Sequence, residues 1–163
     1  KGILLEGGIH VPFVMNWPGT ISAGTVFHDP VSSLDIAPTF IANAGGLTDK
    51  LEGVNLVSNT KQTKTNLAER QLKWRFTISA AIREGKWKLV RLPDRLPMLY
   101  NLEKDSSELH DVSLKNLDKT KTLLKKLGDW DVSLPHPVFL EGAVWKKRQL
   151  HLYDVPYPLV QPR

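Results

Sequence analysis

A run of short strand-like segments in the middle of the 163-residue chain restricts its fold more than any other feature. The segments are rich in alternating apolar, β-branched and aromatic residues, which is the pattern of half-buried strands. They lie at residues 72–77, 80–83, 87–92 and 98–102. Glu84-Gly85-Lys86 separates the second segment from the third and predicts a tight turn, so these two form a β-hairpin. We therefore expect a small antiparallel sheet.

An amphipathic helix is predicted after this sheet. Between residues 117 and 127 leucines recur at helical spacing, and Gly128 is expected to end the helix. Trp87 and Tyr100 fall on the strands and are expected in the core. Residues 72–134 thus predict an α+β subdomain in which one helix covers one antiparallel sheet. The helical stripe facing the sheet would consist of Leu117, Leu123, Leu124 and Leu127.

The first 46 residues have a different pattern. Val11–Trp17 is short and mostly apolar and is closed by Pro18-Gly19, which predicts a buried strand ending in a turn. Asp35 or Ser33 is suited to cap a following helix, which Gly45-Gly46 would end. A strand followed by a helix is half of an α/β layer, so its edges and apolar face would be uncovered. The apolar face would comprise Ile36, Phe40, Ile41 and Ala44.

Two stretches lack strong periodicity. Residues 47–71 are polar and rich in Asn, Thr and Lys, which is typical of a linker or a long surface loop. Residues 135–163 are rich in proline and aromatic residues, and Gln149–Tyr153 suggests a strand within a tail that wraps over the rest. The predicted organisation is the end of a larger α/β domain over 1–46, a linker, the α+β subdomain, and the tail.

The composition excludes several classes of function. The chain has no cysteine, and therefore no disulfide, thiolate metal site or cysteine nucleophile. No stretch approaches the roughly 18 apolar residues of a membrane span. The net charge of +5 is concentrated in residues 61–95, which carry ten basic and three acidic side chains. Such a block is either a solvated strand face or attracts an anionic partner; without a nucleic-acid-binding motif, no nucleic-acid partner is expected.

Five motifs, in order along the chain, point to a known family. They are Lys1-Gly2-Ile3-Leu4-Leu5-Glu6-Gly7-Gly8-Ile9-His10-Val11-Pro12 with Trp17-Pro18-Gly19; residues 30–39 with Ala44-Gly45; residues 51–56; residues 81–90; and residues 99–108. In order and approximate spacing these stretches resemble the C-terminal part of the sulfatase family. The resemblance covers roughly the first two-thirds of the chain. It implies the C-terminal fragment of an alkaline-phosphatase-like α/β fold with a small α+β subdomain.

The resemblance also implies site residues. Sulfatases hydrolyse sulfate esters with a formylglycine hydrate beside a calcium ion, and cationic groups hold the sulfate oxygens. The leading lysine of the first motif is one of these groups, which implies a catalytic, sulfate-binding role for Lys1. Glu6-Gly7-Gly8 is expected to shape the loop that presents Lys1. His10 stands where many members have arginine, so it is either a pH-dependent substrate contact or a partly buried side chain beside a strand.

The remaining catalytic groups are expected upstream of Lys1. Neither the formylglycine motif nor the family's calcium ligands are found here, so no residue of this chain is assigned to a metal and we expect the isolated chain to be inactive. The substrate would be a sulfated small molecule or a sulfated carbohydrate, in a periplasmic or secreted enzyme by family analogy. Two alternatives remain open: a related hydrolase of phosphate esters, and a non-catalytic chain that binds anionic glycans through residues 61–95.

Overall fold

The computed structural model describes residues 2–57, 67–138 and 142–154 and contains two compact units. One unit combines Lys1–Val11 with Gln71–Arg163, and the other is Pro12–Arg70. Residues 2–11 therefore pack with the C-terminal half of the chain. No helix in the described part is long and apolar enough to cross a membrane.

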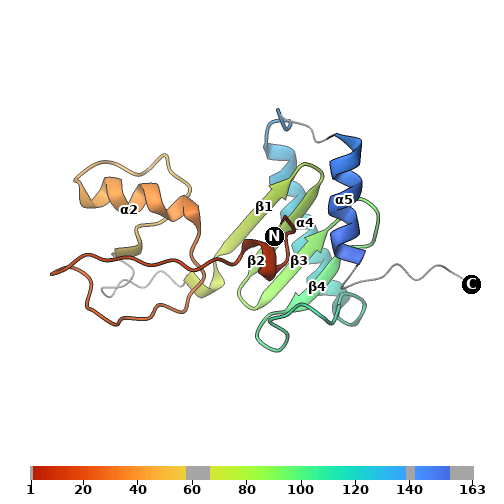
Figure 1. Ribbon diagram of the computed structural model, residues 1–163, viewed down its shortest axis with the longest axis horizontal. Coiled ribbons are helices and arrows are strands. Elements are labelled where there is room, and N and C mark those ends of the chain that lie inside the picture. The colour runs from red at the N-terminus through yellow and green to blue at the C-terminus, as the bar shows by residue number, and fades with distance from the viewer. Residues whose placement is uncertain (1, 58–66, 139–141, 155–163) are drawn as a thin grey trace, which may run out of the picture. The chain divides into compact units, whose positions relative to one another are not determined.

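The first unit is built on a four-stranded antiparallel sheet with strand order β1-β2-β3-β4 (Figure 1). The strands are β1 (Gln71–Phe76), β2 (Ser79–Glu84), β3 (Trp87–Arg91) and β4 (Met98–Asn101). All four predicted strands are confirmed. Glu84 pairs with Trp87 across the hairpin, and Gly85 in the turn has a φ of 57°, which glycine adopts without strain.

Both faces of this sheet are covered, because successive side chains along each strand point to opposite faces. One face packs against helix α4 (Leu117–Ser133), which lies behind the sheet in Figure 1. The other face packs against the N-terminal segment with helix α1 (Glu6–Ile9) and against helix α5 (Ala143–Asp154). The first core contains Ala80, Ile82, Leu89, Leu99, Leu123 and Leu127. The second contains Leu4, Leu5, Ala81, Val90, Leu92, Met98, Tyr100 and Tyr153.

Helix α4 occurs where the sequence predicts it but is longer than expected. Leu123 and Leu127 are fully buried, whereas Leu117, which was placed in the same stripe, is 50% exposed. The predicted end at Gly128 is wrong, since the helix continues to Ser133. A helical glycine costs about 1 kcal/mol relative to alanine. Here Trp130 packs against the core and Asp131 forms ion pairs with the sheet, and these contacts offset that cost.

The last turn of α4 is held to the sheet by one carboxylate. Asp131 pairs with Arg75 on β1 at 3.3 Å and with Arg91 on β3 at 2.6 Å. Burial by itself would raise the pKa of Asp131, but hydrogen bonds and positive charge from Arg91 and Arg75 outweigh it, so the pKa lies below its usual 3.8. Because the folded state depresses this pKa, the ion pairs stabilise the protein at neutral pH. That stability is lost as the pH falls through the depressed value.

We therefore expect Asp131→Asn to lower the free energy of unfolding by on the order of 1 kcal/mol at pH 7 and by a smaller amount near pH 3, where the unfolded chain is already largely protonated at this position. Urea denaturation at both pH values measures this difference. Asp129→Asn is the matched control, because Asp129 is 64% exposed and pairs with Lys125 one turn away. An Asp131→Asn loss that does not shrink on acidification would contradict the assignment.

Helix α5 replaces the strand that was predicted at Gln149–Tyr153. Gln149 and Tyr153 are four residues apart and are both buried, which is the spacing of one helix face. The residues of this segment therefore follow the period of a helix and not that of a strand. The remainder of the tail from residue 155 lies outside the described residues.

The second unit contains helix α2 (Ile36–Asn43), preceded by a short 3₁₀ turn, η1 (Ser33–Asp35). Ser32 and Asp35 form a capping box around this 3₁₀ turn. Asp35 also occupies the N-cap position of α2, but its side chain makes no cap hydrogen bond there, so the predicted side-chain cap of the helix is wrong. The helix ends before Gly45, whose φ is 82°, as predicted.

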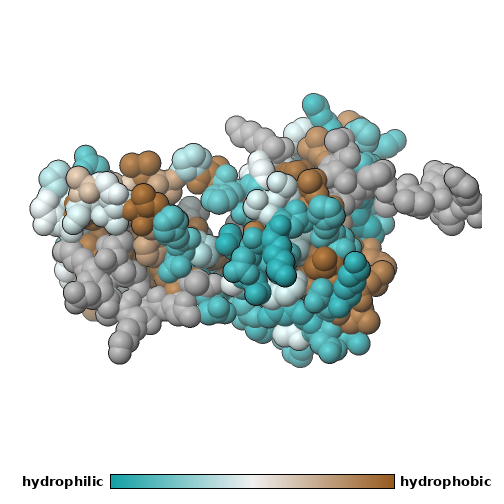
Figure 2. All heavy atoms as spheres, turned by 90° about the horizontal axis from the view of Figure 1, so that it is seen from below, coloured by the Kyte–Doolittle hydropathy of each residue, from teal (hydrophilic) through white to brown (hydrophobic). Residues whose placement is uncertain are grey.

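The strand predicted at Val11–Trp17 is absent. Residues 11–17 are without regular structure, and Phe13 is 46% and Val14 88% exposed. A buried strand needs neighbours to complete its hydrogen bonds, and the described part of this unit contains no strand. The apolar face of α2 is likewise uncovered, with Phe40 68% exposed. Brown side chains accordingly lie at the surface of this unit (Figure 2).

Candidate functional site

The candidate site lies in the N-terminal segment that carries the first motif. Lys1 itself is outside the described residues, but the backbone that follows it is placed from Gly2 onward. Leu4 and Leu5 are buried against the sheet. Gly8 is required for the close turn of α1, because a Cβ there would lie 2.0 Å from the carbonyl oxygen of Ile3. Gly2 has a φ of 87°, a conformation that favours glycine.

A buried cation joins this segment to the sheet. Lys88 on β3 is fully buried, and its Nζ lies 2.8 Å from Glu6 Oε1 and 2.9 Å from Glu108 Oε1. Arg83 on β2 lies 3.6 Å from the other oxygen of Glu6. The Glu6 carboxylate accepts from the side chain of Lys88, so it connects the first motif to the sheet.

Glu108 completes the cluster from the loop after β4. It is 1% exposed, and its carboxylate accepts a hydrogen bond from the backbone N–H of Glu6. Burial raises the pKa of Glu108, and the charge of Lys88 opposes that rise. Asp105 shapes the loop by accepting from the N–H groups of Leu109 and His110. Glu6, Lys88 and Glu108 come from three different motifs, so the cluster joins these three motifs in space.

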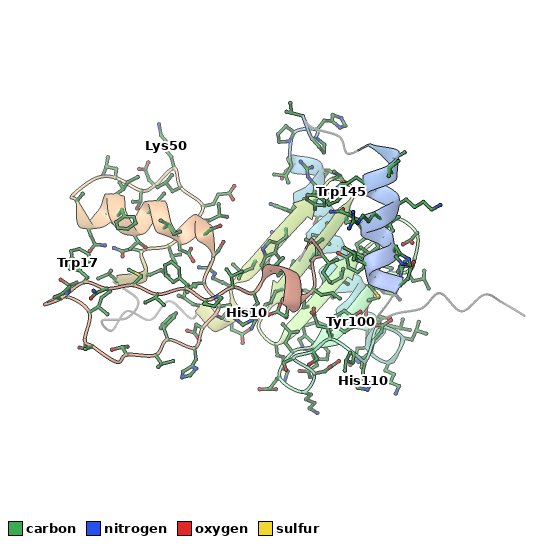
Figure 3. All side chains as sticks on the ribbon, in the orientation of Figure 1. His10, Trp17, Lys50, Tyr100, His110 and Trp145 are labelled. Carbon is green, nitrogen blue, oxygen red and sulfur yellow. The ribbon has the colours of Figure 1, made fainter. Side chains whose placement is uncertain are left out.

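His10 lies immediately after α1 and is exposed (Figure 3). Its side chain is 73% accessible, and Nδ1 lies 3.1 Å from Glu6 Oε2. The alternative of a partly buried histidine beside a strand is therefore wrong. The other four histidines, His28, His110, His136 and His151, are exposed as well.

A second buried ion pair lies within the other unit. Asp35 is fully buried and accepts from both guanidinium nitrogens of Arg70, at 3.0 and 2.8 Å. It also accepts from the backbone N–H groups of Ser32 and Val54. The second and third motifs meet here, because Gly53 packs so closely that a Cβ would lie 2.0 Å from the carbonyl oxygen of Leu34. The role of Asp35 therefore extends well beyond capping.

The basic block of residues 61–95 is largely engaged in internal ion pairs. Seven of its described basic residues pair with carboxylates of the same chain: Arg70, Arg75, Arg83, Lys86, Lys88, Arg91 and Arg95. The interpretation as a solvated strand face is therefore wrong for Lys88 and Arg95, whose side chains are 0% and 8% exposed, whereas the Lys86 side chain is 48% exposed. The same pairing disfavours anion binding through this block, although Lys61 and Lys64 lie outside the described residues.

The described residues do not provide a calcium site. Among them, no group of three or more His, Asp or Glu side chains is arranged to hold a metal ion. Asp105 and Glu108, the acidic pair in the fifth motif, are engaged with backbone N–H groups and with Lys88. No chemical step is therefore assigned to a metal on this part of the chain.

Sequence reasoning did not single out Lys88 or Arg70. A signal for Lys88 was present, because residues 88, 90 and 92 alternate along the strand predicted at 87–92, and the other two are the apolar residues Val90 and Leu92. A lysine on an apolar strand face requires a buried partner. No comparable local signal marks Arg70, which meets Asp35 across 35 residues of sequence.

Comparison with known proteins identifies this architecture. The family model described as "N-sulphoglucosamine sulphohydrolase, C-terminal" matches residues 1–131. The chain belongs to this sulfatase family. The match covers the N-terminal segment, the sheet and most of α4, and the predicted fold class, a sulfatase C-terminal portion with an α+β subdomain, is confirmed.

Relatives of this sulfatase chain are themselves sulfatases. Arylsulfatase K of Danio rerio is 32% identical over 140 residues, which is 78% of this chain and 27% of the relative. Choline-sulfatase of Rhizobium meliloti (strain 1021) is 33% identical over 116 residues, or 66% of this chain and 22% of that protein. The chain thus spans about a quarter of these relatives. The crystal structure of Ps i-CgsB in complex with k-i-k-neocarrahexaose matches with a TM-score of 0.67 and 28% identity, covering 86% of this chain and 33% of that one.

Proposed function

We propose that the intact protein hydrolyses sulfate esters and that Lys1 binds the sulfate group of the substrate. The observation that carries the proposal is the sulfatase family match over residues 1–131, which includes the Lys1 motif. Relatives named as an arylsulfatase and a choline-sulfatase support the reaction class. The nucleophile and the calcium ligands would come from residues that precede Lys1 in the intact enzyme. A sulfated small molecule or a sulfated carbohydrate would be the substrate.

The geometry around the motif supports a role for Lys1. From Gly2 to Ile9 the segment packs against the sheet, and its buried contacts involve backbone atoms as well as side chains. An ammonium group placed in advance stabilises the negative charge that develops on the sulfate and leaving-group oxygens without reorganisation during the reaction. His10 is a second candidate contact on the same segment: the Glu6 contact uses Nδ1, so Nε2 would serve the substrate.

The test is the hydrolysis of an aryl sulfate and an aryl phosphate by the intact enzyme and by its Lys1→Ala variant. We expect sulfate ester hydrolysis to dominate and kcat/KM to fall about 10²-fold in Lys1→Ala. Lys86→Ala is the control, because Lys86 is a partly exposed turn residue paired with Glu103. Preferential hydrolysis of the phosphate ester would favour the related phosphoesterase. An unchanged kcat/KM in Lys1→Ala would contradict the role of Lys1.

A further inference from the structure

Helix α5 contacts the backbone of the Lys1 motif directly. The backbone N–H of Leu4 donates to the phenol oxygen of Tyr153 at 2.7 Å, across 149 residues of sequence. The side-chain amide of Gln149 donates to the carbonyl oxygen of Gly2 at 3.4 Å. Tyr153 is 3% and Gln149 8% exposed; the contact with Leu4 is buried, whereas the contact with the exposed Gly2 is partly buried. The family match ends at residue 131, so α5 lies beyond it.

We propose that Tyr153 and Gln149 are positioning residues that fix the place of Lys1, an inference that rests on the proposed sulfate-binding role of Lys1. Their two contacts fall on residues 2 and 4, which are the first described backbone positions after Lys1. Gly2 has few conformational restraints of its own and adopts a φ of 87°. A side chain that precedes a glycine is placed reproducibly only when the backbone after that glycine is held.

Helix α5 is itself held in the same unit. Arg95, from the loop between β3 and β4, lies 2.7 Å from Asp154 at the end of the helix, next to Tyr153. The guanidinium also pairs with Asp94 at 2.8 Å. Tyr153 packs in the same apolar cluster as Leu4, Leu5 and Tyr100. Figure 3 labels Tyr100 on β4. Helix α5 and the apolar cluster therefore both hold the phenol of Tyr153 in the position where it accepts from the N–H of Leu4.

These contacts are suited to positioning because they act on the backbone. A phenol oxygen that accepts from the N–H of Leu4 satisfies a buried donor, and a buried N–H left unpaired costs free energy. Removing the hydroxyl leaves this donor unpaired and frees residues 2–4 to move. An ammonium group at Lys1 then samples more positions around the sulfate, and its binding contribution falls.

The experiment measures inhibition of the intact enzyme by inorganic sulfate. Tyr153→Phe keeps the ring and removes only the hydroxyl, so we expect the inhibition constant for sulfate to rise about 5- to 10-fold. Gln149→Met, which keeps the side-chain length, should raise it by a smaller factor. Trp145→Phe is the control on the same helix, because Trp145 is 49% exposed.

A double-variant comparison separates positioning from stability. In a Lys1→Ala background, Tyr153→Phe should produce no further rise in the inhibition constant, because the two residues act through one interaction. An equal rise in both backgrounds, or a fall in maximal rate with an unchanged inhibition constant, would overturn the positioning role.

If Lys1→Ala alone leaves sulfate inhibition unchanged, the proposed function of Lys1 fails, and the inference fails with it. If only Lys1→Ala has an effect, the positioning role alone is overturned. If Tyr153→Phe does not fold, Gln149→Met is measured in its place and judged by the same criteria.

Discussion

Replacing Lys88 by methionine is expected to lower the free energy of unfolding of the intact protein by about 3–5 kcal/mol at pH 8. The Lys88 ammonium is fully buried between Glu6 and Glu108, at 2.8 and 2.9 Å. Methionine matches the volume of the lysine stem but removes the charge. Two neighbouring carboxylates then lose their shared cation, and Glu108 is almost completely buried. Leaving a buried charge unpaired is costlier than losing the ion pair itself.

The loss of stability in Lys88→Met should be smaller at low pH than at high pH. Burial already raises the pKa of Glu108, and Lys88 is the main group that lowers it. Without Lys88 this pKa rises further, so the folded variant binds a proton more tightly than the unfolded chain does. Its stability is therefore greatest at low pH and falls as the pH rises through the raised pKa. Urea denaturation at about pH 5 and pH 8 should give a smaller Lys88→Met loss at the lower value.

Two further variants make this prediction specific. Adding Glu108→Gln to Lys88→Met removes one of the unpaired carboxylates, so the double variant should be more stable than Lys88→Met alone. Lys86→Met changes a lysine that is two residues away but 48% exposed, and a change within about 0.5 kcal/mol is expected there. A Lys88→Met loss below about 1 kcal/mol, or one that is independent of pH, would refute the description of the cluster.

Local patterns were sufficient to predict the sheet and parts of the helices. The turn at Gly85 and the alternation along β2 and β3 involve only residues that are close together in the sequence, so the hairpin was predictable. The end of α4 was not, because Gly128 is a local stop signal that the contacts of Trp130 and Asp131 override. Similarly, the extended pattern of Val11–Trp17 was interpreted as a buried strand, although the described residues provide no neighbouring strand to pair with it.

The family motifs could be recognised from the sequence, but their physical meaning could not. Glu6, Lys88 and Glu108 are separated by up to 102 residues, and their meeting depends on which face of the sheet the N-terminal segment covers. The same is true of Tyr153, whose partner Leu4 lies 149 residues away. Long-range polar pairs of this kind leave only an indirect trace in a single sequence, such as a lysine at an inward-facing strand position.

Replacing Asp35 by alanine should destabilise the second unit by about 3–5 kcal/mol, for a reason that differs from that of Lys88. Asp35 is fully buried and accepts four hydrogen bonds. Two come from Arg70, at 3.0 and 2.8 Å, and two from the backbone of Ser32 and Val54, at 2.7 and 3.0 Å. The change therefore removes the partner of a guanidinium that is only 16% exposed and leaves two backbone donors without their acceptor.

The measurement is urea denaturation of the intact protein combined with hydrogen exchange at the Val54 amide, which should exchange faster in Asp35→Ala because its acceptor is gone. Asp49→Ala is the matched control, since Asp49 is an exposed residue of the same unit. Combining Asp35→Ala with Arg70→Met removes the unpaired cation and should recover part of the loss. If Asp35→Ala and Asp49→Ala have the same free energy of unfolding, then Asp35 does not connect α2 to the segment around Val54. The same conclusion follows if adding Arg70→Met to Asp35→Ala lowers the free energy of unfolding further instead of recovering part of it. Faster exchange at Val54 together with partial recovery by Arg70→Met would establish that one carboxylate holds the second and third sulfatase motifs together.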